Sequence, residues 1–395
     1  MKKYFSLSAA LLAGIGCAGA QGLFDIAQDD EAQESLPLQW SVSGSVGYDD
    51  NVVPLSGIED SSMYVAGYVG ASMLNHSPQS TLDINARLGY IHYLDDVVGM
   101  QDDGSVQARL GLNWAHRVNE RLRFSSRNYV AYEREPDYSW GYAGAQQTGE
   151  YLFWSSDNAV GYRWTERLAT YTGIKFTGVE YDDAPGQDRN SWGAYHQFRY
   201  QFTPQTIVTF DYRYDSTNGK SLADSENHFF LLGVEQRFSP QTVGVFRAGL
   251  QERDVDGGAS NSNLYIEGAL NTQVNESLSL NAFVRYGTED YNRRIGAAIY
   301  DDSNTLRIGA KANYAVSPRL TLHGGAHYLA YGYEEGRFGA PDVDEDLFNV
   351  YAGFTFEVRE NLYLNGSYNF DTYSSDVNFR EYDRNRFNLG VQMVF

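Results

Sequence analysis

The feature that most constrains this chain is a regular alternation of short polar turns with long acidic connections. Seven of the short turns are built alike, with a strand-ending apolar or aromatic residue followed by a tight polar segment. They are VNERL at Val118, WTERL at Trp164, FTPQT at Phe202, FSPQT at Phe238, VNESL at Val274, VSPRL at Val316 and VRENL at Val358. An eighth turn, LNHSPQS at Leu74, has the same place in the first hairpin.

Nine longer connections, rich in Asp and Glu, alternate with these turns. They are Asp50 to Asp60, Asp95 to Asp103, Glu133 to Gln147, Asp182 to Asn190, Asp215 to Glu226, Asp254 to Asn261, Asp290 to Asn304, Glu334 to Asp346 and Asp371 to Asp383. Seventeen connections predict eighteen strands, each of roughly 10 to 14 residues, long enough to cross an outer membrane at the usual tilt. An even strand number puts both termini of the barrel-forming chain on the periplasmic side, together with the short turns, and puts the long loops outside.

The predicted strands alternate apolar and polar residues, as expected when one face of a sheet meets lipid and the other meets water. In the last segment the apolar face consists of Phe387, Leu389, Val391, Met393 and Phe395. After the first residues, no apolar stretch approaches the roughly 20 residues that a membrane helix needs. We therefore expect an all-β, transmembrane, antiparallel up-and-down β-barrel of about 18 strands. The last strand should close it by pairing with the segment from Leu38 to Tyr48.

One segment breaks this alternation. Ser155, Ser156, Asp157 and Asn158 are four consecutive polar residues and leave the register of the sixth predicted strand open. Such a run is expected either at a contact with a neighbouring subunit or at a bend in the wall. The oligomeric state is left open.

The first twenty residues are predicted to be a secretory signal peptide. Lys2 and Lys3 precede an apolar run from Leu7 to Ile15, and Ala18-Gly19-Ala20 has the small residues of a cleavage site. Cys17, the only cysteine, lies in this segment. A lipid anchor on Cys17 is disfavoured, because the residues before it make a poor lipobox. The mature chain is then expected to contain no disulfide.

The remaining chain is divided into two parts. Residues 21–36 are expected to form a short acidic leader that lies in the periplasm or plugs the barrel, and residues 37–395 to form the barrel itself. The formal charge of the whole chain is −21. So acidic a chain argues against nucleic acid and anionic membrane surfaces as partners. The expected partners are outer-membrane lipid and lipopolysaccharide.

The alternation assigns twelve basic residues to the inward face. They are Arg87, Arg109, Arg123, Arg127, Arg199, Arg213, Arg237, Arg247, Arg285, Arg307, Lys311 and Arg386. The acids assigned to the same face are Asp83, Asp157, Asp211, Glu235, Glu267 and Glu357. Guanidinium groups on a pore wall hold carboxylates and bias which ions pass, so these residues are candidates for lining a pore that favours anionic or uronate-like solutes. The alternative is that Arg and Asp on neighbouring strands simply pair with one another.

Nothing in the sequence indicates covalent chemistry. His323 and His327 are expected to face inward, but no serine motif accompanies them. The segment Asp254-Val255-Asp256-Gly257 begins like a calcium loop but lacks the downstream Glu. We expect no catalytic residue, no metal site and no cofactor. Divalent ions that bridge loop acids to lipopolysaccharide are an open alternative.

The first predicted strand ends in Gly47-Tyr48-Asp49-Asp50-Asn51. In a chain with an export signal and a final Phe, this segment resembles the second type of the putative β-barrel porin family, outer-membrane barrels linked to exopolysaccharide production in Gram-negative bacteria. The resemblance implies an outer-membrane location, a role in polysaccharide secretion with other secretion components, and no catalytic residues. Phe395 also resembles the terminal aromatic by which the barrel assembly machinery recognises its clients.

Two functions are compatible with this sequence. The first is a porin-like barrel that passes or helps to secrete hydrophilic solutes, exopolysaccharide among them, through a polar, Arg-rich lumen. The alternative is a structural or adhesion barrel whose lumen is closed by loops such as Glu133 to Gln147 and Glu334 to Asp346. An enzyme is not expected.

Overall fold

The computed structural model describes residues 35–395 apart from 55–58, 101, 135–148, 183–184, 221–222, 259, 290–292, 296–297, 301, 335, 337–338 and 378–379. The predicted signal peptide, almost all of the leader and most of the segment from Glu133 to Gln147 therefore lie outside the described residues. In the part that is described, no helix is long and apolar enough to span a membrane. The one helical element among the described residues is a short 3-10 turn at Pro185–Gln187.

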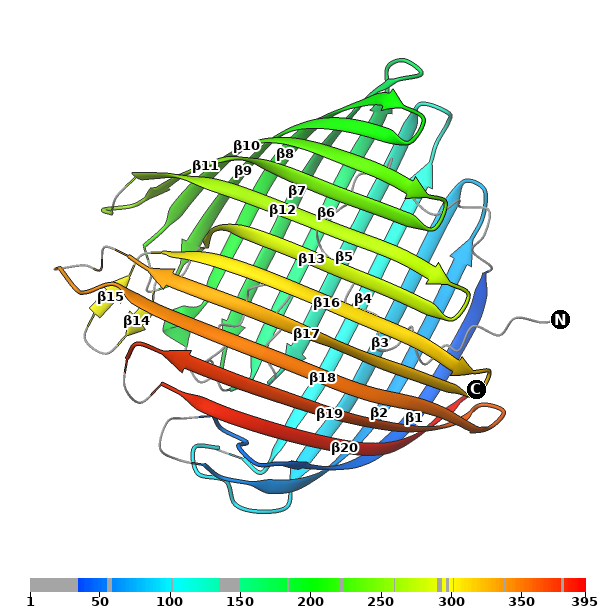
Figure 1. Cartoon of the computed structure of the whole chain (residues 1–395), viewed down its shortest axis with the longest axis vertical. Coiled ribbons are helices and arrows are strands. Elements are labelled where there is room, and N and C mark those ends of the chain that lie inside the picture. Colours follow the sequence, from blue (N-terminus) through cyan, green and yellow to red (C-terminus); the bar gives the residue numbers. More distant parts are fainter. Residues whose placement is uncertain are drawn as a thin grey trace.

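Eighteen long antiparallel strands form one sheet, as predicted. They are β1 (Leu36–Asp49), β2 (Ser62–His76), β3 (Ser80–Tyr93), β4 (Gly104–Arg117), β5 (Leu122–Glu133), β6 (Tyr151–Arg163), β7 (Leu168–Tyr181), β8 (Arg189–Thr203), β9 (Thr206–Gly219), β10 (Ser225–Ser239), β11 (Thr242–Val255), β12 (Ser260–Asn275), β13 (Leu278–Glu289), β16 (Ser303–Ser317), β17 (Leu320–Tyr333), β18 (Val343–Arg359), β19 (Leu362–Ser375) and β20 (Tyr382–Val394). Each pairs with its sequence neighbours, and the tilted ribbons wrap into a barrel (Figure 1).

The barrel closes between β1 and β20, as expected from the terminal strand. Their register runs from Ser41 opposite Val394 to Asp49 opposite Arg386. Backbone hydrogen bonds continue it beyond the strand, since the Phe395 amide donates to the Trp40 carbonyl at 2.8 Å. A closed sheet leaves no edge with unpaired N–H and C=O groups, which a bilayer could not satisfy.

The tight turns recur in sequence because a side chain in most of them accepts hydrogen bonds from backbone N–H groups of the same turn. Asn119 Oδ1 accepts from the amides of the residues two and three positions later at 2.8 and 2.9 Å. Asn275, Thr165 and Ser317 do the same in their own turns. The turn VRENL has a different backbone conformation. Asn361 is left-handed there, with φ 64°, and Asn tolerates this conformation better than most residues.

Several strands run further toward the loop end than the sequence predicted. Asp215 lies in β9, Asp254 in β11, Asp371 in β19 and Asp346 in β18, although all four were assigned to loops. The predicted loop from Asp290 to Asn304 contains a separate small hairpin, β14 (Arg293–Ile295) with β15 (Ala298–Tyr300). Asp215 and Asp371 face inward and Asp254 and Asp346 face outward near the loop end, so an acidic residue does not by itself mark the end of a strand.

The two faces of the wall differ as the alternation predicted. In β10, Leu231 is completely buried while its neighbours Phe230 and Leu232 are 41% and 65% exposed. The same contrast recurs around the barrel, so the exposed side chains form an apolar outer surface. Aromatic residues such as Trp164 and Phe238 lie on this surface at the turn end, where outer-membrane barrels carry an interfacial girdle.

At the loop end, connecting segments pack against inward-facing side chains. Val52, Val53 and Val97 come from two loops and form a buried cluster with Tyr64 and Tyr93. The β14–β15 hairpin contributes Tyr300 to a second cluster, together with Leu329, Tyr331, Tyr333, Val343, Leu347 and Tyr373. These contacts hold the described parts of the loops over the inner wall.

The sixth strand is regular, which answers the question that the sequence left open. β6 pairs residue by residue with β5 and β7 without a register shift. The run Ser155 to Asn158 therefore causes no bend. Ser155 and Asp157 face inward, and Ser156 and Asn158 face outward among apolar residues.

Candidate functional site

The inner wall holds a network of six charged side chains between β8 and β12. Its members are Arg199, Asp211, Arg213, Glu235, Arg247 and Glu267. Cross-strand neighbours on one face of a sheet lie close enough to interact. Three guanidinium groups therefore balance three carboxylates in this network.

Arg247 lies at the centre of this network and is 2% exposed. Its Nε lies 3.2 Å from Asp211, its Nη2 3.1 Å from Glu235 and its Nη1 2.9 Å from Glu267. Arg213 reaches Glu267 from the other side at 2.7 and 3.1 Å. Charges buried to this degree need partners, so these residues stabilise one another and fix the wall.

Further ion pairs link the wall nearer the loop end. Arg307 donates to both carboxylate oxygens of Glu289 at 2.8 and 2.7 Å. Arg109 forms a bidentate ion pair with Glu133, from Nε and Nη2 to the two carboxylate oxygens. Neither acid is among those predicted for the inward face: Glu133 was placed in a predicted loop, and Glu289 directly precedes the predicted loop from Asp290. The continuing period of two was the signal that could have found them, since Glu133 and Glu289 follow inward residues at even spacing.

The twelve predicted pore-lining residues fall into two groups. Those with ion pairs to carboxylates are Arg109, Arg199, Arg213, Arg247, Arg285, Arg307 and Arg386. The other five stand on the same face, with Arg87 opposite Arg109, Arg123 opposite Arg117, Arg127 opposite Asp157, Arg237 opposite Val243 and Lys311 opposite Asn281. Of these five, Arg123, Arg127, Arg237 and Lys311 also interact with further groups. Among the described ion pairs, Arg109, Arg247, Arg307 and Arg386 pair with acids on a neighbouring strand, as in the alternative that the sequence left open. Arg199 and Arg213 instead reach acids two and three strands away, and Arg285 contacts Glu289 of its own strand.

The segment from Gly47 to Asn51 locks the closing strands together. Asp49 is 1% exposed and forms an ion pair with Arg384 of β20, with Nε to Oδ1 at 3.0 Å. Asp50 accepts hydrogen bonds from the backbone and side-chain amides of Asn385 at 2.6 and 2.7 Å. Asp50, predicted as the first residue of a loop, thus helps Asp49 to join the two ends of the sheet.

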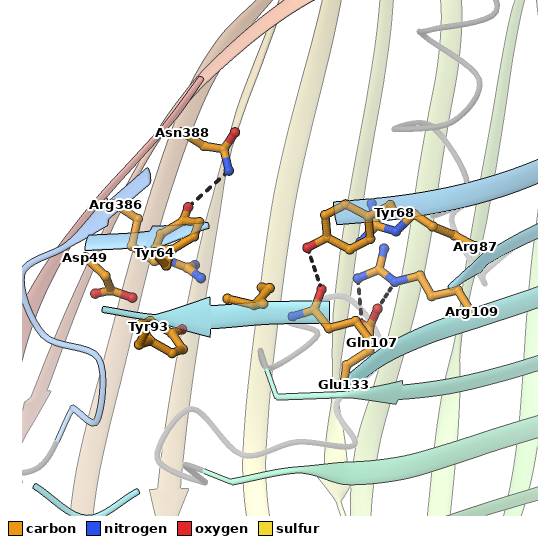
Figure 2. Close-up of a pocket in the computed structure, with 11 residues that line it drawn as sticks. Asp49, Tyr64, Tyr68, Arg87, Tyr93, Gln107, Arg109, Glu133, Arg386 and Asn388 are labelled. Atoms are coloured by element: carbon orange, nitrogen blue, oxygen red, sulfur yellow. Dashed lines mark hydrogen bonds and ion pairs between the residues drawn. The ribbon is translucent and has the colours of Figure 1, made fainter. Parts of the chain in front are cut away.

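Next to this seam the inner wall forms a pocket of about 200 Å³. It is lined from six strands by Asp49, Tyr64, Tyr68, Arg87, Ile91, Tyr93, Gln107, Arg109, Glu133, Arg386 and Asn388. Figure 2 shows these side chains facing one another, with Tyr64 and Asn388 at the seam and Arg87, Tyr68 and Arg109 on the neighbouring wall.

Arg87 is the distinctive group in this pocket. Its guanidinium stacks on the Tyr68 ring, 4.4 Å from the centroid. Within the described part of the chain it has no hydrogen bond or ion pair with a carboxylate. Tyr68 in turn donates to Gln107 Oε1 at 3.0 Å. Gly89, opposite Tyr68 in the register, makes this arrangement possible, because a Cβ there would fall 2.5 Å from a backbone oxygen and against the Tyr68 ring.

The N–H donors of a guanidinium lie in its own plane, so a guanidinium that stacks on an aromatic ring can still donate them to an incoming anion. Besides the ion-paired Arg109, Arg386, Asp49 and Glu133, the pocket therefore combines the Arg87 guanidinium with amide and phenol groups that can bind hydroxyls. His327, expected to face inward, contacts Asn349 at 3.0 Å. Among the described residues, no cluster of His, Cys, Asp or Glu has an arrangement that could hold a metal ion.

A closed antiparallel barrel with an apolar outer belt and a charged inner wall is a transmembrane β-barrel of the outer-membrane class. The comparison with protein families identifies it further. The chain belongs to the family described as Putative beta-barrel porin 2, whose model matches residues 38–395. It is thus a porin-like barrel of the outer membrane, as the resemblance of the first strand implied.

No protein of curated function matches the chain. Solved structures that resemble it include Pseudomonas aeruginosa OccK2 in complex with glucuronate, at 12% identity over 92% of this chain and 100% of that chain, with a TM-score of 0.47. P. aeruginosa OpdK with vanillate matches at 13% identity over 91% and 99%, with a TM-score of 0.48. Acinetobacter baumannii OccAB4 matches at 13% identity over 92% and 99%, with a TM-score of 0.47.

Proposed function

We propose that this barrel passes or helps to secrete hydrophilic anionic solutes through a lumen lined by the arginine-bearing wall. The observation that carries the proposal is the pocket around Arg87. Its guanidinium is oriented by Tyr68, and no ion pair with a described carboxylate neutralises it. Membership of a porin family supports passage of solutes over a structural or adhesion role.

An acidic sugar fits this chemistry. Its carboxylate would take the N–H donors of Arg87, while its hydroxyls would meet Gln107 and Asn388, which also line the pocket. The well-paired arginines of the wall, such as Arg247, would contribute a polar surface without binding a solute tightly. The resemblance to barrels linked to exopolysaccharide production makes an acidic polysaccharide the solute class of this proposal.

Conductance in planar bilayers tests the pore. Purified, folded barrel should conduct, and the reversal potential in a salt gradient should show a preference for anions. Arg87→Gln should shift this preference toward cations, whereas Arg121→Gln, on an exposed turn, should not. A folded barrel without conductance would refute the open pore.

Two further measurements test the solute. Sodium glucuronate should reduce single-channel current at concentrations where glucose has no effect, and Arg87→Gln should weaken this block. In the producing bacterium, deletion of the gene should lower exopolysaccharide in the medium. Unchanged secretion in the deletion strain would remove the polysaccharide from the proposal and leave the conductance results standing.

A further inference from the structure

The outer surface of the barrel carries a polar cluster where lipid chains are expected. Ser126 and Asn128 of β5 lie opposite Asn158 and Ser156 of β6, and the alternation turns all four side chains outward. Figure 1 shows β5 and β6 side by side in the wall. Asn128 and Ser156 lie near the middle of their strands, far from the turn and loop ends where lipid headgroups lie.

These four side chains form a closed ring of hydrogen bonds. Ser126 donates to Asn158 Oδ1 at 2.7 Å, Asn158 to Ser156 Oγ at 2.9 Å, Ser156 to Asn128 Oδ1 at 2.7 Å, and Asn128 to Ser126 Oγ at 3.0 Å. Each amide nitrogen has two N–H donors and gives one to the ring. In the part of the chain that is described, no partner takes the second N–H of Asn128 or Asn158.

Apolar residues surround this cluster on every side. Leu112 and Trp114 flank it on β4, and Ile174 and Phe176 flank it on β7. Along the strands, the next outward pairs are Phe124 with Val160 and Val130 with Trp154. The cluster is therefore isolated within the apolar outer surface and is not continuous with the polar ends of the barrel.

A second, separate polar pair lies on the outward face of the following two strands. Thr172 of β7 shares a hydrogen bond of 2.8 Å with His196 of β8, and both side chains also face outward. By contrast, the outward residues of β16 at similar positions are Leu306, Ile308, Ala310, Ala312 and Tyr314. At these positions β16 is apolar, whereas β5 to β8 carry polar side chains among their apolar outward residues.

We propose that the outer face of β5 to β8 binds a second copy of this chain in the membrane. Lipid tails offer no acceptor for the remaining N–H groups, whereas polar side chains from another barrel do. All copies insert with the same orientation, so residues of equal height meet when two copies pack side by side. The amides of one copy then meet hydroxyls and amides of the other, and the apolar rim packs around them.

Cross-linking tests this surface. Asn158→Cys should yield a covalent dimer in outer membranes treated with a short bismaleimide. Ile308→Cys is the matched control, because Ile308 is outward and 43% exposed on a strand that lies nine strands from β5 in both directions around the barrel. Cross-linking of Asn158→Cys to itself, and not of Ile308→Cys, supports the proposal.

Mass measurement in mild detergent provides the second test. The unaltered barrel should be an oligomer by light scattering, and the double variant Asn128→Leu with Asn158→Leu should lower the oligomeric fraction at least tenfold. A gel shift on heating would show that the variant barrel is folded. A monomeric unaltered barrel, equal cross-linking at both cysteines, or cross-linking of Asn158→Cys only to a different protein would each overturn the proposal.

Discussion

Replacing Arg247 by Met should destabilise the barrel more than any other single substitution of a wall arginine that we consider. Arg247 is within 3.2 Å of Asp211, 3.1 Å of Glu235 and 2.9 Å of Glu267. Its removal leaves three carboxylates beside two guanidinium groups; Asp211, Glu235 and Arg199 are buried, and the side chains of Glu267 and Arg213 are 12% and 26% exposed. Breaking a buried ion pair by removing one partner costs about 3–5 kcal/mol, and we expect the loss to lie in this range.

A matched control is available on the same wall. Arg285 is also a strand residue, but its side chain is 39% exposed and its contact with Glu289 is 4.0 Å, so Arg285→Met should cost roughly 0.2–1 kcal/mol. The variant Arg247→Met with Asp211→Asn restores the balance of two guanidinium groups and two carboxylates. It should therefore lose less stability than Arg247→Met alone.

Urea unfolding of the barrel in lipid vesicles measures these differences. Tryptophan fluorescence reports the transition, and the free energy of unfolding in water follows from linear extrapolation. The reasoning is wrong if Arg247→Met costs no more than Arg285→Met. It is also wrong if Asp211→Asn makes the Arg247→Met barrel less stable still, because the charge balance would then not be the cause.

Three smaller predictions concern the turns and the seam. Gly47→Ala should lower the free energy of unfolding by about 1–3 kcal/mol, because its Cβ would lie 2.5 Å from the Phe387 carbonyl oxygen. The control Gly44→Ala, whose Cβ would lie 3.9 Å from the nearest atom, should be near neutral. Equal unfolding midpoints for the two variants would contradict the close approach at Gly47. Asn361 has a left-handed backbone with φ 64°, which Gly adopts freely and Ala does not. Asn361→Ala should therefore lower the free energy of unfolding by about 1–2 kcal/mol, and Asn361→Gly should leave it almost unchanged. Unfolding of the two variants in urea measures this difference. Deletion of Phe395 removes the hydrogen bond to Trp40 and the terminal aromatic, and should lower the folded, heat-shifting fraction in outer membranes; an unchanged fraction would show that assembly does not use this residue.

The strand count and the orientation of the wall could be predicted because both follow from local patterns. Turns such as FTPQT and VNESL satisfy their own backbone within a few residues, so the sequence marks them directly. Alternation along each strand separates an apolar face from a polar one, as Leu231 between Phe230 and Leu232 illustrates. The errors lay at the loop ends of the strands, where Asp371 and Glu133 resemble loop residues but form ion pairs with arginines on adjacent strands.

The candidate site was predictable only in part. Arg87 was assigned to the inward face, yet its distinction from Arg109 or Arg247 depends on which acids lie within reach. The register of neighbouring strands and the positions of side chains such as Tyr68 decide which acids are within reach. No local sequence pattern predicts either of them. The acidic motif at Asp49 and Asp50 was likewise visible in the sequence, but its partners on β20 are 335 residues away.

The amino-acid sequence by itself determined an eighteen-stranded barrel, its lipid-facing side and the pairing of its first and last strands. These depend on the period of two and on turn chemistry, which are local. Only the tertiary structure decided which charges on the wall neutralise one another, which guanidinium lacks a carboxylate partner among the described residues, and that four polar side chains of β5 and β6 meet on the outer face. These depend on distances between strands, and closure of the sheet sets those distances for every strand at once.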